Sequence, residues 1–266
     1  IPHASAAVNA KQILSTKGID IPIVTTLHGT DITLLGKDKS FKPVIEYAIN
    51  MSDAVTVVSE DLKKETLEHF NIEKKIQIIP NFIDKTLYQD EQDMKLRRNF
   101  AKDEEFILTH ISNFRKVKRV NDVIGIFEQV SKILPTKLLM IGDGPDRLEA
   151  EQLCRKLGIS QNVKFLGKLK IIEKILAITD VFVLPSSTES FGLVALEAMA
   201  SKTAVISTNS GGLPEVNING ETGYLSDVGD INKMAKDTLK LLNDKVLLNS
   251  FKMNAFAHAN TFDIVN

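Results

Sequence analysis

Cysteine is almost absent from this sequence, since Cys154 is the only one in 266 residues. A single cysteine excludes a disulfide framework and a thiolate metal cluster, because both need several. Basic residues are not in excess either: 33 Lys and Arg stand against 34 Asp and Glu, which argues against general nucleic-acid binding. No apolar run approaches the roughly 18 residues that span a bilayer, and no charged-then-apolar leader opens the chain. We therefore expect a cytoplasmic protein with neither a nucleic-acid nor a membrane partner.

Several motifs of cofactor and nucleophile chemistry are missing as well. His, Cys and Asp residues do not recur with metal-ligand spacing, and no Asp-x-Asp pair follows a strand-like run. No Gly-x-Gly-x-x-Gly lies between a strand and a helix, which disfavours a dinucleotide-dependent oxidoreductase. No Ser-His or Cys-His arrangement marks a covalent nucleophile. The sequence therefore predicts chemistry with no metal site and no cofactor.

Short β-branched apolar runs alternate with helical patterns through most of the chain, which is typical of βαβ units and a parallel sheet. Strand-like runs are 21–27, 54–58, 75–79, 106–111, 137–141, 163–166, 181–184 and 204–207. Helical patterns cover 4–15, 42–50, 60–70, 120–133, 147–157, 170–177, 191–200 and 231–258. The highly charged segment 84–102 breaks this alternation. We therefore predict two domains, 1–88 and 89–266, and the second forms a complete Rossmann-like unit.

Two carboxylates lie eight positions apart around the start of a predicted helix. Glu189 precedes the helix, and Glu197 lies about a turn and a half inside it. The unpaired N–H groups of a helix's first turn form an anion site. A carboxylate on either side of that anion can accept hydrogen bonds from hydroxyl groups. The pattern fits a phosphate flanked by two polyols, which describes a nucleotide-sugar.

This pair resembles the Glu-x7-Glu signature of retaining glycosyltransferases of the GT-B architecture, a family that includes sucrose and glycogen synthases. The resemblance extends through four further motifs, at 28–31, 80–84, 142–145 and 211–215. Residues 27–31 and 112–119 together are most similar to a branch that transfers N-acetylglucosamine to L-malate in bacillithiol biosynthesis. The resemblance implies an α/β protein with two Rossmann-like domains facing across a cleft. Residues 1–88 then belong to the acceptor-side domain and 89–266 to the nucleotide-sugar-binding domain.

The ends of the chain also bear on this resemblance, because members of the family are longer at both ends. The chain opens at Ile1 without an initiating Met and stops at Asn266 within another predicted element. The resemblance implies that the first strands, a glycine-rich loop facing the donor phosphates and a closing C-terminal helix are missing. We interpret the chain as a fragment with an incomplete N-terminal domain, which leaves open whether this length is active.

The donor site implied by the resemblance centres on the two carboxylates. Glu197 is expected to bind the ribose and Glu189 the hydroxyls of the donor sugar. The simpler alternatives are an exposed helix charge and a carboxylate complementing the helix dipole, but Glu197 stands among apolar residues, where an unpaired carboxylate is costly. The other implied donor-binding residues are Ser59, Asn81, Gly142, Leu166, Ser190, Phe191, Gly192, Leu193 and Val194. Ser59 and Asn81 can equally be a helix cap and a turn residue.

Arg115 and Lys118 follow the strand-like run 106–111. Two cations there can clamp a departing diphosphate, an electrostatic role that dominates many transfer reactions. The alternative is a solvated basic turn. The resemblance supports a catalytic Lys118, whereas Asn113 stands where many relatives carry Arg. Arg115 must therefore act from a shifted position.

The acceptor side rests on fewer residues. The resemblance places His28 beneath the reacting sugar, where it can hydrogen-bond a hydroxyl or steady positive charge; a turn histidine is the alternative. Thr26 and Thr30 offer hydroxyls, and Lys42 offers charge for a dianionic acceptor, although exposed lysines are usually just solvated.

The function implied is retaining transfer of N-acetylglucosamine from UDP-N-acetylglucosamine to a small hydroxy acid, L-malate. The mechanism expected is front-face, in which the leaving diphosphate draws the acceptor proton. Three alternatives stay open: a transferase of this family with another acceptor, a nucleotide-sugar epimerase, and a non-catalytic nucleotide-sugar-binding fragment. The sequence does not fix the oligomeric state, and a homo-oligomer is compatible with it.

Overall fold

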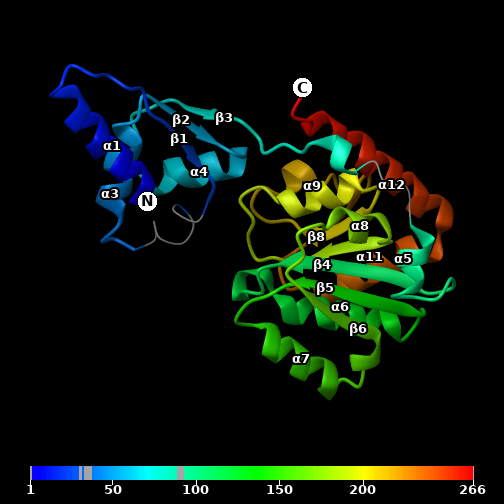
Figure 1. Cartoon of the computed structure of the whole chain (residues 1–266). Coiled ribbons are helices and arrows are strands. Elements are labelled where there is room, and N and C mark those ends of the chain that lie inside the picture. The colour runs from blue at the N-terminus through cyan, green and yellow to red at the C-terminus, as the bar shows by residue number, and fades with distance from the viewer. Residues whose placement is uncertain (1, 30–31, 33–37, 89–92, 266) are drawn as a thin grey trace. The chain divides into compact units, whose positions relative to one another are not determined.

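The chain divides into two compact units, Ile1–Asn81 and Phe82–Asn266 (Figure 1). The computed structural model describes residues 2–29, 32, 38–88 and 93–265. The domain boundary predicted from the sequence lies after residue 88. The structure groups residues 82–88 with the second unit, because Ile83 pairs with Asp263 and Tyr88 hydrogen-bonds to Glu197.

The first unit is a parallel sheet with helices packed against it. Its strands, in the order β1-β2-β3, are β1 (Val24–Leu27), β2 (Ala54–Val57) and β3 (Ile76–Ile78). Its helices are α1 (Pro2–Ser15), α3 (Lys42–Asn50) and α4 (Glu60–His69). Strand β1 begins later than predicted, because the Ile23 N–H donates to the Asp53 carboxylate at 2.6 Å rather than to a neighbouring strand.

The second unit is built on a six-stranded parallel sheet in the order β6-β5-β4-β7-β8-β9. The strands are β4 (Phe106–Ser112), β5 (Thr136–Gly142), β6 (Val163–Gly167), β7 (Val181–Leu184), β8 (Ala204–Thr208) and β9 (Gly223–Ser226). The chain runs outward from β4 through β5 to β6, then returns to β7 on the other side of β4. This reversal is the topological switch point of a doubly wound sheet.

Helices cover both faces of this sheet, as Figure 1 shows. They include α6 (Val120–Ser131), α7 (Arg147–Lys156), α8 (Glu173–Ala177), α9 (Leu193–Ala200), α11 (Ile231–Asn243) and α12 (Lys245–Ala259). Alternate strand residues point to opposite faces. Leu108 joins the apolar cluster under α6 and α7, whereas Ile107 joins the one under α8. The sheet is therefore buried on both sides, and its open positions are the strand ends.

Further differences from the sequence prediction lie at β9 and in the C-terminal helical stretch. Strand β9 (Gly223–Ser226) was not predicted, because four residues that begin with glycine carry little strand signal. The helical stretch expected over 231–258 is two helices, α11 and α12. Asp244 separates them, since its carboxylate accepts the N–H groups of Val246 and Leu247 and so caps the start of α12.

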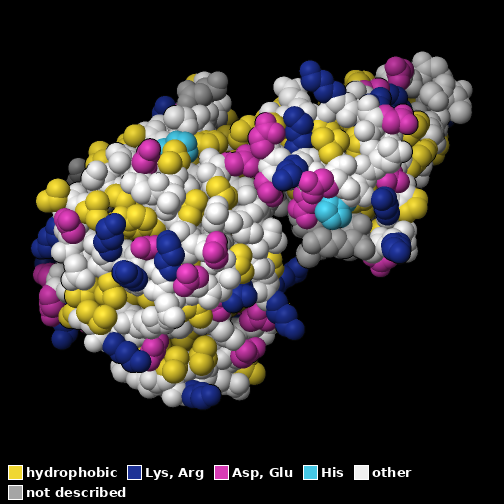
Figure 2. All heavy atoms as spheres, turned by 180° about the vertical axis from the view of Figure 1, so that it is seen from behind, with side chains coloured by type: hydrophobic (Ala, Val, Ile, Leu, Met, Phe, Trp, Pro, Cys, Tyr) yellow, Lys and Arg dark blue, Asp and Glu magenta, His cyan; other side chains and the backbone are white. Residues whose placement is uncertain are grey.

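The surface shown in Figure 2 mixes acidic and basic side chains rather than segregating them, in keeping with the net charge of −1. In the described part of the chain, no helix combines the length and apolar character needed to cross a membrane. The same part holds no group of three His, Cys, Asp or Glu side chains placed to share a metal ion.

A buried ion pair ties the strands of the second unit together at the end opposite the loops described below. The Arg97 guanidinium, on α5 (Met94–Arg98), donates to the Ile178 carbonyl at 2.7 Å and to the Asp180 carboxylate at 2.9 Å. The same carboxylate accepts the Ile107 N–H at 2.8 Å. Both side chains are nearly buried, with 8% and 12% exposed.

Replacing Arg97 by alanine is therefore expected to lower the free energy of unfolding by about 2–3 kcal/mol, the range for a lost hydrogen bond to a charged group, because the Asp180 carboxylate then keeps only the more distant Lys252 Nζ, at 3.4 Å. Urea unfolding followed by circular dichroism measures this change. The neighbouring Arg98 is the matched control, since its pair with Asp103 is exposed, and Arg98→Ala should leave stability within experimental error. Equal losses in the two variants would contradict the assignment.

Candidate functional site

Three loops meet at the carboxyl ends of β4, β7 and β8, beside the switch point. They are the β4 loop (113–119), the β7 loop (185–192) and the β8 loop (209–212). The Ser187 N–H donates to the Val117 carbonyl at 2.8 Å, and the Gly212 N–H donates to the Glu189 carbonyl at 2.7 Å. The β7 loop is therefore held between the other two. Ligands of open α/β sheets bind in this position.

Lys118 and Glu189, predicted separately from the sequence, form an ion pair at the centre of the three loops. The Lys118 Nζ lies 2.6 Å from Glu189 Oε1, and the Ser186 hydroxyl donates to the same oxygen at 2.8 Å. The two side chains are 19% and 12% exposed. A partly desolvated lysine can attract an anion once Glu189 no longer pairs with it.

Helix α9 begins four residues after Glu189, at the end of the β7 loop. Gly192 is the residue before the helix and has a φ of +96°, a conformation that glycine adopts without steric cost. The helix therefore begins at Leu193, two residues later than predicted, and the first-turn N–H groups of Leu193 and Val194 have no intrahelical carbonyl to bond. Leu193 is 40% exposed, so this end of α9 is open to solvent.

Glycines of the β8 loop allow the β7 loop to lie close. A side chain on Gly211, which has a φ of +61°, would collide with the main chain of Glu189. A Cβ on Gly212 would lie 2.6 Å from the Ser190 carbonyl oxygen. The predicted Gly211-Gly212 motif thus acts through close backbone packing, which fixes the loop that carries Glu189.

Glu197 lies further along α9 and has a protein partner. The Tyr88 hydroxyl donates to Glu197 Oε1 at 3.3 Å. Burial raises the pKa of the Glu197 carboxyl to about 7; the Tyr88 hydrogen bond works in the lowering direction, and the charge of Glu173 in the raising one. The carboxylate therefore sits in a setting where additional hydrogen-bond donors would stabilise its charged form.

This raised pKa predicts a pH-dependent stability difference between the wild type and Glu197→Gln. The folded pKa lies above the ordinary value of 4.5, so the folded state favours the protonated carboxyl. Stability from this group is fully present below pH 4.5 and is lost as the pH rises through 7. The wild type should lose about 3 kcal/mol relative to Glu197→Gln over that range. Urea unfolding at pH 4.5, 6 and 8 tests this, and parallel curves would contradict it.

The other residues predicted for the donor site are more scattered. Arg115 is exposed, and among the described residues its side chain has no hydrogen-bond or ion-pair partner. Gly142 ends β5 with a φ of +122°, where a Cβ would collide with the Ser112 carbonyl. Leu166 lies on β6, at the edge of the sheet. Phe191 is buried and packs on Phe262, with ring centroids 5.8 Å apart.

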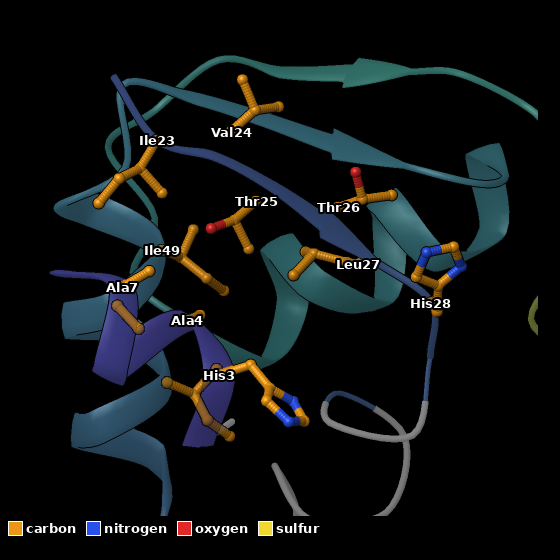
Figure 3. Close-up of a pocket in the computed structure, with 12 residues that line it drawn as sticks. His3, Ala4, Ala7, Ile23, Val24, Thr25, Thr26, Leu27, His28 and Ile49 are labelled. Carbon is orange, nitrogen blue, oxygen red and sulfur yellow. The ribbon is translucent and has the colours of Figure 1, made fainter. Parts of the chain in front are cut away.

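The remaining predicted residues belong to the first unit. Figure 3 shows His28 at the end of β1, where it and Thr26 help to line a pocket of 410 Å³. The Thr26 hydroxyl accepts a hydrogen bond from Thr56 at 2.8 Å. Ser59 caps α4, and the Lys42 Nζ lies 3.8 Å from Glu46. Asn81 ends the unit, and Thr30 lies outside the described residues.

His110, which the sequence marks only as a polar residue in an apolar strand, shapes the β4 loop. Burial lowers its pKa to about 4, so the ring is neutral. Nδ1 donates to the Val183 carbonyl at 2.9 Å, since a carbonyl only accepts, and Nε2 accepts the Ser112 hydroxyl at 2.8 Å. The Ser112 oxygen accepts the Phe114 N–H at 3.2 Å. This chain supports the left-handed turn at Phe114, whose φ is 38°.

Comparison with known proteins gives matches to both units. Residues 91–258 match the family described as glycosyl transferases group 1, and residues 1–87 match glycosyltransferase family 4. The chain is 46% identical to N-acetyl-alpha-D-glucosaminyl L-malate synthase of Bacillus anthracis, over 93% of this chain and 64% of that protein. It is 28% identical to glycogen synthase of Mycobacterium tuberculosis, over 85% of this chain and 55% of that protein. The chain thus spans less than two thirds of the length of either relative.

Solved structures agree with the fold. Anabaena HepE in complex with UDP and glucose matches with a TM-score of 0.86 at 24% identity, over 98% of this chain and 73% of that one. Sucrose-phosphate synthase from Thermosynechococcus elongatus matches with a TM-score of 0.83 at 23% identity, over 95% and 66%. The predicted α/β class with two Rossmann-like domains of the GT-B type is confirmed. The group 1 match covers residues 91–258, which is more than half of the chain and includes the loops that carry Lys118 and Glu189. The chain therefore belongs to the glycosyl transferases group 1 family.

Proposed function

We propose that this chain is part of a retaining glycosyltransferase that moves N-acetylglucosamine from UDP-N-acetylglucosamine to L-malate, a step of bacillithiol biosynthesis. The observation that carries the proposal is the gathering of Lys118, Glu189 and the open end of α9 at the switch point of the second unit. The 46% identity to the malate enzyme supports this choice of donor and acceptor.

The donor diphosphate is assigned to the first-turn amides of α9 and to Lys118. Both stabilise negative charge, and that charge grows on the diphosphate as the glycosidic bond breaks. Binding exchanges the Lys118–Glu189 pair for a Lys118–phosphate contact. Glu189 is then released to accept hydroxyls of the donor sugar, and Glu197 accepts those of the ribose. Ser190, Phe191, Gly192 and Gly142 supply main-chain contacts, with Leu166 near the uracil edge.

The acceptor chemistry is assigned to the first unit. L-malate is a dianion at neutral pH, and Lys42 supplies positive charge for it, whereas Arg115 is assigned with Lys118 to the departing diphosphate. Thr26 and Thr30 supply hydroxyls, and His28 hydrogen-bonds the transferred sugar. In the front-face mechanism, an oxygen of the leaving diphosphate takes the proton of the malate hydroxyl. The malate oxygen bonds to the anomeric carbon on the same face from which UDP leaves, as the bond between that carbon and the diphosphate breaks.

The reaction is tested by incubating the chain with UDP-N-acetylglucosamine, with and without L-malate, and measuring free UDP. The proposal expects UDP release that depends on malate. If UDP is released with another hydroxy acid but not with malate, the acceptor is a different one. Conversion of the donor alone, without any acceptor, indicates a nucleotide-sugar epimerase. Thermal stabilisation by the donor without turnover indicates a binding module.

A further inference from the structure

A short segment that connects the two units, residues 82–88, reaches Glu197 on α9. Ile83 exchanges main-chain hydrogen bonds with residues 262 and 264, each at 2.9 Å. The Lys85 Nζ lies 2.6 Å from the Asp263 carboxylate, whose side chain is 1% exposed. The 3-10 helix η2 (Lys85–Tyr88) starts from this anchor and packs against α8 and α9. The place of Tyr88 is therefore set by a half-buried ion pair and by a backbone pairing.

The side chain of Tyr88 ends on one oxygen of Glu197. Its hydroxyl donates to Oε1 at 3.3 Å, and the ring is half-buried. Among the described residues, Oε2 of Glu197 has no hydrogen-bond donor. Glu173, on α8, is an acidic neighbour of both groups. Its charge disfavours the ionised forms of Tyr88 and Glu197 and so raises the pKa of each. One oxygen is thus held and the other is available.

We propose that Tyr88 is a positioning residue for nucleotide recognition: its hydroxyl holds Oε1 of Glu197 so that Oε2 faces the hydroxyls of the donor ribose. This inference rests on the proposed function, which places the ribose at Glu197. A carboxylate on a helix can rotate about its side-chain bonds, and one fixed oxygen removes most of that freedom before the ligand arrives.

The same hydrogen bond favours the charged form of the carboxylate, which is the stronger acceptor. Tyr88 lowers the pKa of Glu197 against the opposing effects of burial and of Glu173. Removing the hydroxyl leaves only the two opposing effects. The protonated fraction at a given pH then rises, and ribose hydroxyls meet a weaker acceptor.

The test compares Tyr88→Phe with the wild type by isothermal titration of UDP and of 2′,3′-dideoxyuridine diphosphate, which lacks the ribose hydroxyls. Tyr88→Phe should weaken UDP binding about tenfold, the effect of one hydrogen bond to a charged group, and should leave the dideoxy ligand's affinity unchanged. The pH at which UDP binding is half-maximal should also rise. Tyr47→Phe is the matched control, because the Tyr47 hydroxyl bonds to Gln12 in the first unit, and it should change neither affinity.

Equal weakening of both ligands by Tyr88→Phe would show a purely structural role and overturn the inference. Unchanged UDP affinity would overturn it as well. If the wild type binds UDP with no preference over the dideoxy ligand, the ribose does not meet Glu197 and the inference fails, while the diphosphate site stands. If the wild type does not bind UDP, the proposed function fails, and the inference fails with it.

Discussion

Lys118→Ala is expected to lower turnover about 10²–10³-fold, the usual cost of removing one preorganised group that stabilises developing charge. Lys118 is the cation that faces the β7 loop, and its charge matters most when the diphosphate leaves. The KM for L-malate should change little, because the acceptor is bound elsewhere. Initial rates over a grid of both substrates measure turnover and KM separately.

Lys116→Ala provides the control for this prediction. Lys116 stands in the same basic turn but is exposed, so turnover should stay near the wild-type value. Thermal unfolding of both variants checks that Glu189, left without its cation in Lys118→Ala, does not unfold the loop. Parallel changes in turnover and in the malate KM would argue against a transition-state role for Lys118.

Gly211→Ala is expected to weaken UDP binding about 10–100-fold, because moving the β7 loop loses a hydrogen bond to the charged diphosphate. The new Cβ would collide with main-chain atoms of Glu189, and these cannot yield without moving the β7 loop. The same variant should lower the free energy of unfolding by about 3 kcal/mol, in the range of steric and backbone strain combined. Titration with UDP and urea unfolding measure the two effects.

Gly158→Ala separates collision from backbone strain. Gly158 also has a positive φ, +70°, but nothing lies within 4 Å of a Cβ placed there. It should lose only about 1–2 kcal/mol of stability from the strained conformation, with UDP affinity unchanged. If Gly211→Ala binds UDP as well as Gly158→Ala does, the β8 loop does not support the donor site.

Most of the fold follows from patterns that are local in the sequence. Helix α3 occupies 42–50 as predicted, because its apolar spacing and proline near the start are properties of the segment itself. Strands β4 to β8 follow from their apolar runs. Strand β9 escaped prediction, since a short edge strand is decided by tertiary packing. The break at Asp244 was missed although its cap is a local signal, because the apolar helical pattern continues on both sides of it.

The candidate site was predicted residue by residue but not as an assembly. Lys118 and Glu189 were each expected near the donor, yet their ion pair joins positions 71 residues apart, and no local pattern encodes it. Tyr88 fell in a charged stretch interpreted as a domain boundary, so its contact with Glu197 was invisible in the sequence. His110 was one of several dispersed histidines until the sheet placed it beside Val183 and Ser112.

The most direct test of this account is a structure of the chain bound to UDP-N-acetylglucosamine. We expect the diphosphate to lie within hydrogen-bond distance of the Leu193 and Val194 amides and of the Lys118 Nζ, with Glu189 turned from Lys118 to the sugar. A nucleotide bound away from α9, with the Lys118–Glu189 pair still closed, would contradict it.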